Sequence, residues 1–171
     1  MIFSSDCEDM IAPEELGECV VRILEKLPEV QTFHLTNRIR TNAELSSFIQ
    51  SMMCLPRNRS HRSYPHIEVV YANNEEEAEN LLQGYDMQGY QRRQICSEMR
   101  SMAVRDAERL AVVLDKRYHY NEKGHLRSSQ CIEENMSDVR RLFHVLNQAK
   151  ERLALIVMGN EKVYEVLLSL L

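Results

Sequence analysis

The chain has 171 residues, of which 44% are hydrophobic, 27% charged and 6% aromatic, which is typical of one soluble globular domain. A chain of this length buries roughly 70% of its unfolded surface, so neither disulfides nor a structural metal is required for stability. Its longest apolar run, Leu153 to Met158, is far shorter than the roughly 20 residues of a membrane span. Neither wholesale disorder nor a membrane-spanning helix is expected, and without a basic N-terminal region we expect a cytoplasmic, untargeted domain.

The net charge of −5 argues against a protein that coats nucleic acid by bulk attraction. The charge is uneven, because residues 1–30 are strongly acidic whereas residues 38–62 hold five arginines against a single glutamate. The cysteines lie too far apart for a C-x-x-C zinc or redox site, and buried structural thiols are the simplest interpretation. These cysteines are Cys7, Cys19, Cys54, Cys96 and Cys131.

Short β-rich runs alternate with longer segments of helical spacing, which is typical of a parallel sheet with crossover helices. The first part of the chain predicts a strand at 2–4, a helix between Pro13 and Pro28, and a strand over 30–35. Thr41-Asn42-Ala43-Glu44 then has the form of a capping box and predicts a second helix. The buried face of that helix is expected to carry Leu45, Phe48, Ile49, Met52 and Met53.

The middle of the chain begins with residues 56–65, which have no apolar period and predict an exposed loop. A strand follows over 67–72, and Asn74 is placed to cap a helix with an acidic first turn. We expect a short strand at 94–96 with a helix after it, and a buried strand over 110–115. The inner face of the helix after Asn74 is expected to carry Ala78, Leu81, Leu82 and Tyr85.

The last part of the chain predicts a small hairpin over 118–127, which turns at Gly124. A long amphipathic helix is expected from Val139 to Leu153, followed by a second buried strand over 153–158 and a helix capped by Asn160. One side of that last helix is expected to carry Val163, Tyr164, Leu167, Leu168 and Leu171. The sequence therefore predicts a single α/β domain over 1–171, with three layers and a mostly parallel sheet that has helices on both faces.

Phosphate-binding and catalytic signatures are missing from the sequence. Gly84 and Gly89 have G-x-x-x-x-G spacing, but Tyr90 and Gln91 stand where a phosphate loop needs lysine and serine or threonine, so a helix end and a turn are the better interpretation. No G-x-G-x-x-G fingerprint and no G-x-S-x-G nucleophile elbow occur. The six histidines are scattered, so no metal site is predicted.

Three arginines in the loop over 56–65, Arg57, Arg59 and Arg62, are candidates for contacts with nucleic acid. The guanidinium group matches a phosphate with a planar fork of donors, which is why arginine suits this role. An ordinary solvated loop is the alternative interpretation of the same segment.

A family resemblance extends along nearly the whole chain. The segment Phe33-His-Leu-Thr-Asn-Arg-Ile-Arg-Thr-Asn-Ala-Glu-Leu-Ser-Ser-Phe-Ile49 resembles the start of the second RecA-like domain in an uncharacterised group of bacterial superfamily 1 helicase-like ATPases, which is also similar to Schlafen helicase domains. Residues 67–82, 112–127 and 142–157 resemble successive blocks of that domain, and 1–10 resembles the last strand of the family's first domain. The resemblance implies a RecA-like, P-loop NTPase-type fold.

In such enzymes ATP lies between two RecA-like domains, and the first domain brings the phosphate loop and the magnesium site, which this chain lacks. The resemblance implies that Arg40 is the motif IV arginine that faces the phosphates and that Lys150 is a second nucleotide contact. The motif VI pattern Thr-Arg-Ala-Arg reads Asn-Gln-Ala-Lys over 147–150, so Gln148 stands in place of an arginine finger. Such a finger typically contributes about 10³ to 10⁵ in rate. Motif V, over 100–107, is also not matched.

These observations predict a non-catalytic, helicase-derived binding module for a protein partner or single-stranded nucleic acid, with no cofactor of its own. The alternative is a second-domain subunit or fragment of a split ATP-dependent helicase-like ATPase, which supplies Arg40 in trans and uses ATP and magnesium only when a partner brings the phosphate loop. A truncated remnant is a third possibility. Because the face of the missing first domain would be uncovered, a homodimer or a dedicated protein partner is expected to cover it.

Overall fold

The computed structural model describes residues 42–55, 63–93, 95, 106–129 and 138–171, and all of them belong to one compact unit that spans 39–171. The strands predicted at 2–4 and 30–35 and the helix predicted between Pro13 and Pro28 lie outside the described residues. The same holds for the helix predicted after 94–96 and for most of the loop over 56–65.

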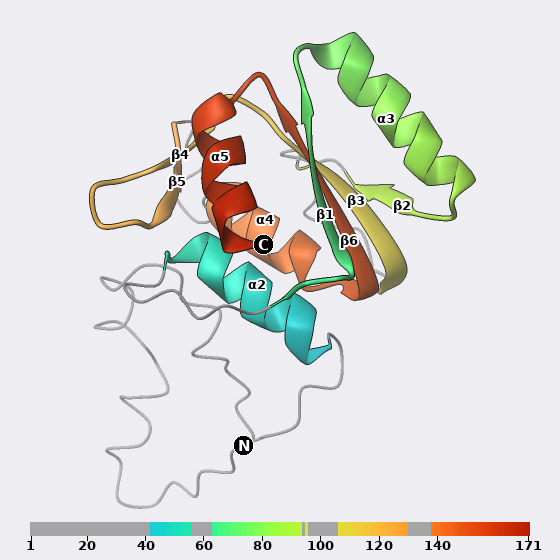
Figure 1. The fold of residues 1–171 in the computed structure, drawn as a ribbon, viewed down its shortest axis with the longest axis horizontal. Helices are drawn as coiled ribbons and strands as arrows, with labels where there is room; N and C mark the ends of the chain where they lie inside the picture. Colours follow the sequence, from blue (N-terminus) through green and yellow to red (C-terminus); the bar gives the residue numbers. More distant parts are fainter. Residues whose placement is uncertain (1–41, 56–62, 94, 96–105, 130–137) are drawn as a thin grey trace, which may run out of the picture. The chain divides into compact units, whose positions relative to one another are not determined.

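The core of the unit is a sheet of four parallel strands in the order β1-β6-β3-β2 (Figure 1). Their bounds are Ile67–Ala72 for β1, Gln91–Arg93 for β2, Ala107–Leu114 for β3 and Ala149–Met158 for β6. The longest strand, β6, lies between β1 and β3, with Leu155 opposite both Val69 and Val112. A continuous apolar run suits such a strand, because helices cover it on both faces.

Helices cover both faces of this sheet. The helix α3 (Glu75–Met87) packs on one face, while α2 (Ala43–Met53), α4 (Asp138–Leu146) and α5 (Glu161–Leu170) lie on the other (Figure 1). The predicted three-layer α/β arrangement is therefore confirmed, and it is compatible with a RecA-like domain. Within the described ranges, every helix falls short of the length and apolar character needed to cross a bilayer.

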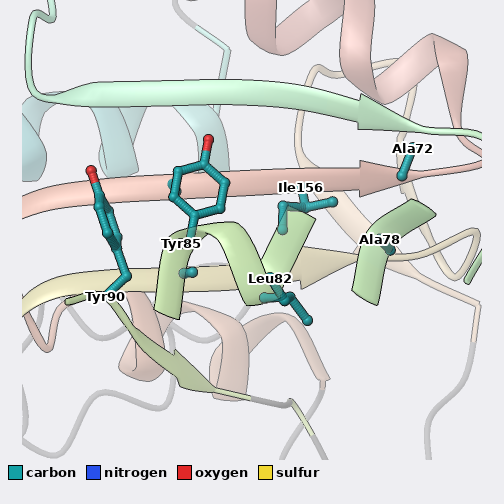
Figure 2. Close-up of a cluster of buried hydrophobic side chains, with 8 residues drawn as sticks. Ala72, Ala78, Leu82, Tyr85, Tyr90 and Ile156 are labelled. Carbon is teal, nitrogen blue, oxygen red and sulfur yellow. The ribbon is translucent and has the colours of Figure 1, made fainter. Parts of the chain in front are cut away.

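Small side chains on the sheet let α3 approach closely. Ala72, Ala111 and Ala154 lie in one buried cluster with the inner face of α3 and with Ile156, and Figure 2 shows Ala78, Leu82 and Tyr85 of the helix beside the strands. The ring of Tyr85 meets that of Tyr90 edge to face, with 5.0 Å between centroids. The cluster fixes the helix on the sheet, and its members are Ala72, Ala78, Leu82, Tyr85, Tyr90, Ala111, Ala154 and Ile156.

Three of the helices begin at an asparagine whose side chain accepts a backbone N–H: Asn42 for α2, Asn74 for α3 and Asn160 for α5. The prediction of a Thr41 capping box is wrong in its detail, because Asn42 is the cap. The carboxylate of Glu44 accepts the backbone N–H of His66 at 2.8 Å and lies 2.6 Å from the His66 Nδ1, which ties α2 to the start of β1.

Several predicted boundaries differ from the structure. The strand β2 lies at Gln91–Arg93, before the predicted strand over 94–96, of which only Ile95 is described and is not in a strand. The helix expected to run to Leu153 ends at Leu146, and the strands expected from 110 and 153 begin at Ala107 and Ala149. Apolar residues at 149 and 153 fit a helix of period 3.6 as well as a strand. The strand forms because Asn147 ends α4, with its side-chain Nδ2 donating to the Phe143 carbonyl at 2.9 Å, and the chain then enters the sheet beside β3.

The predicted hairpin is confirmed as β4 (Tyr118–Tyr120) and β5 (Leu126–Ser128), and Gly124 has a φ of 77° in its turn. The predicted inner side of α5 is partly wrong, since Leu168 and Leu171 are 43% and 39% exposed. Cys54 is exposed, which contradicts its interpretation as a buried structural thiol. The other four cysteines lie outside the described residues.

Burial raises the pKa of Tyr85, Tyr118 and Tyr120 above the usual tyrosine value of about 10. The folded state then keeps protons that the unfolded chain releases, so their contribution to stability is fully present below about pH 10 and is lost as the pH rises above it. We expect alkaline unfolding in which each such tyrosine adds a slope of about 1.4 kcal/mol per pH unit. Far-UV circular dichroism, measured against pH, follows this transition.

A matched variant checks this alkaline transition. The hydroxyl of Tyr118 is buried and has no hydrogen-bond partner among the described residues, so Tyr118→Phe removes a titrating group without removing a bond. The variant should therefore unfold at a higher pH than the original protein. An alkaline transition of Tyr118→Phe at the same or a lower pH would contradict the prediction.

Candidate functional site

Gln148, which the resemblance aligns with motif VI, lies directly before β6. Gln148 is 7% exposed, and its backbone carbonyl accepts the N–H of Ala107 at 2.9 Å. Its side-chain Oε1 is buried and has no hydrogen-bond partner among the described residues. The next charged side chain, Lys150, is about half exposed, and its Nζ lies 3.4 Å from a carboxylate oxygen of Asp106. This end of the sheet therefore presents one lysine that already faces an acid.

The remaining candidate residues of the sequence lie outside the described residues. These are Arg40, Arg57, Arg59 and Arg62. Their roles stay predictions, and Lys150 is the single member of the predicted set that the described ranges contain. Within those ranges, no group of three histidine, cysteine or acidic side chains is placed to hold a metal ion.

A pocket of about 370 Å³ lies at the opposite end of the sheet, where β1, β3 and β6 finish. The pocket is lined by the residues that follow β1 and β3 and by the last residue of β6. They are Asn73, Asn74 and Glu75 after β1, Asp115, Lys116 and Arg117 after β3, and Met158 of β6. The carboxyl ends of parallel strands are where open α/β sheets bind ligands.

Hydrogen bonds hold the strand ends around this pocket. The N–H of Gly159 donates to the Ala72 carbonyl at 2.8 Å, which joins the end of β6 to the end of β1. The side-chain Nδ2 of Asn160 donates to the carbonyls of Asp115 at 3.3 Å and Tyr118 at 2.8 Å, while its Oδ1 caps α5. One asparagine thus fixes the chain after β3 against the start of α5.

The acidic groups at the pocket are largely matched by neighbours. The Asp115 carboxylate accepts the Arg117 Nε and backbone N–H, each at 2.9 Å, and this pairing raises the pKa of Arg117. At the start of α3 the Glu77 carboxylate accepts the backbone and side-chain N–H groups of Asn73, both at 2.8 Å, which lowers the pKa of Glu77. Of the two acids that line the pocket, Asp115 is thus engaged by Arg117, and Glu75 at the start of α3 is exposed.

Lys116 lies across the backbone of Gly159. That glycine has a φ of 61°, in the left-handed region, and a Cβ built there would lie 2.6 Å from the Lys116 Cε and 3.4 Å from its Nζ. Any side chain at position 159 would displace the lysine. Among the described residues, Lys116 forms no ion pair, although Glu75 and Asp115 also line the pocket, and its exposed ammonium group is open to solvent.

Sequence reasoning identified Asn74 and Asn160 as caps but missed that both belong to one end of the sheet. The available signal was positional, because polar residues follow β1 and β3 directly and Asn160 comes two residues after β6. Recognising the site required the strand order, which places the ends of β1, β6 and β3 side by side.

The chain matches no protein-family model, no curated protein and no solved structure.

Proposed function

We propose that the chain is a non-catalytic binding module derived from a helicase-like domain. The burial of Gln148 carries the proposal, because the resemblance has an arginine finger at this position. A neutral amide inside the fold offers no positive charge to the γ-phosphate of a nucleotide held by another domain. Lys150, the cation of the same segment, faces Asp106 at 3.4 Å. These residues do not fit the nucleotide-contacting role of motif VI.

A protein is the partner that the described surface favours. The first turn of α3 exposes Glu75 and Glu76, whose charges repel a phosphate backbone. Single-stranded nucleic acid is the second candidate, and it depends on Arg57, Arg59 and Arg62. Binding through these arginines should weaken steeply with salt and be lost when all three are changed to glutamine. Salt-independent or undetectable binding would leave the protein partner.

Steady-state ATP hydrolysis tests the non-catalytic role. The purified protein should show no turnover above the rate of the buffer, and Arg40→Ala should leave that result unchanged. Turnover that disappears in Arg40→Ala would contradict the proposal. Turnover that appears when a separate chain with a phosphate loop and an acidic magnesium motif is added would instead support the split ATPase, with Arg40 acting in trans.

A further inference from the structure

We infer that the pocket at the carboxyl end of the sheet binds a small molecule through an anionic group, with Lys116 as the cation that receives it. The pocket and the motif VI segment lie at opposite ends of β6, so this inference is independent of the proposed function. It depends on the topology, on the position of Lys116 and on the charges around it.

The topology leaves a crevice at this place. The chain leaves β1 to form α3 on one face of the sheet, and it leaves the adjacent β6 to form α5 on the other face (Figure 1). When the connections after two adjacent strands run to opposite faces of the sheet, they leave a crevice at the carboxyl ends of these strands. Ligands of open parallel sheets bind in this crevice. The pocket lies there and extends to the end of β3.

The position of Lys116 is prepared before any ligand arrives. The strand ends on either side are fixed by the Gly159 to Ala72 hydrogen bond and by Asn160, and the missing side chain at 159 gives the lysine its place. The backbone around the pocket is thus fixed, while the exposed Lys116 side chain is free to turn toward an anion. Since Asp115 is engaged by Arg117, an external anion is the natural counter-charge for Lys116.

The size and charge of the pocket decide the class of ligand. Its volume of about 370 Å³ is near the lower limit of small-molecule sites. Glu75 at the rim disfavours a polyanion such as a triphosphate or a nucleic-acid backbone. Met158 offers an apolar surface to the body of the ligand. These features fit a small molecule that carries one phosphate or one carboxylate group.

Amide chemical shifts of the full chain, measured with ¹⁵N labelling, provide the test. Inorganic phosphate and acetate are titrated separately at constant ionic strength with chloride as the balancing salt. We expect saturable shifts at Asn74, Lys116 and Gly159, and the tighter of the two probes identifies the anionic group. Lys116→Gln should weaken binding at least about tenfold, because a charge-assisted contact is lost. Lys123→Gln, at an exposed lysine of the hairpin, should bind as the original protein does.

A second variant tests the role of the glycine. Gly159→Ala should displace Lys116 and weaken the same titration, provided that circular dichroism shows a folded protein. Lys116→Gln is an exposed substitution that leaves the fold intact, so it keeps the test decisive even when Gly159→Ala unfolds. Absence of saturable shifts with both anions, or equal affinity in Lys116→Gln, would overturn the inference.

Discussion

Asp138→Ala is expected to lower the free energy of unfolding by about 3–5 kcal/mol, as happens when one partner of a buried ion pair is removed. Asp138 begins α4 and is 2% exposed. One of its carboxylate oxygens lies 3.3 Å from a terminal nitrogen of Arg117 and accepts the Ser128 hydroxyl at 3.5 Å, while the other lies 3.6 Å from Arg141. The alanine would leave Arg141, which is 6% exposed, without this carboxylate. Urea unfolding followed by circular dichroism measures the loss.

Two further variants separate charge from packing at this site. Asp138→Asn keeps the side-chain volume but removes the charge, so a loss close to that of the alanine variant would show that the charge dominates. In the double variant Asp138→Ala with Arg141→Met, the cation is removed as well, and part of the stability should return. If Asp138→Ala lowers the free energy of unfolding by less than about 1 kcal/mol, the ion pairs of Asp138 are as weak as surface ion pairs, which would contradict the prediction.

Leu155→Ala is expected to lower the free energy of unfolding by about 2–5 kcal/mol, which is the range for a leucine truncated in a well-packed core. Leu155 is fully buried in β6, between Val69 of β1 and Val112 of β3. Because both neighbouring strands and the covering helices fix its surroundings, the cavity has little room to collapse. The measurement is the midpoint of urea unfolding at an unchanged m-value.

Leu168→Ala is the matched control for this core substitution. It removes the same atoms from a leucine on α5 that is 43% exposed. It should lower the free energy of unfolding by on the order of 0.5 kcal/mol, well below the loss in the core variant. Equal losses at the two positions would mean that β6 is not the centre of the core.

The elements in which local propensity, apolar spacing and end signals favour the same structure were predictable from the sequence. β1 has the bounds predicted from its β-rich run over 67–72, and α3 follows from Asn74, the acidic first turn and the inner-face spacing of Ala78, Leu82 and Tyr85. The hairpin at 118–127 was fixed by alternation and by Gly124. Local propensity and tertiary contacts point to the same structure in these segments.

Other features depended on contacts between distant residues. Ala149 fits either a helix or a strand, and only its place opposite Ala107 decides for the strand. Glu44 was expected to close a capping box, but its carboxylate contacts His66, which is 22 residues away in the sequence. The Lys116 pocket required the strand order, because nothing in a single segment shows which strand ends become neighbours. Register and neighbourhood in a parallel sheet are set by pairing over long sequence separations.

The strand at the centre of the sheet, β6, comes after every other strand in the chain. During synthesis, β1 and β3 therefore leave the ribosome with a gap between them that only residues 149–158 can fill. The edges of β1 and β3 that pair with β6 stay unpaired until β6 has been synthesised. The sheet can therefore form only after β6 has left the ribosome. Nascent chains stopped before residue 149 should be held by chaperones and cleaved readily by protease, and chains extended beyond β6 should become resistant in one step.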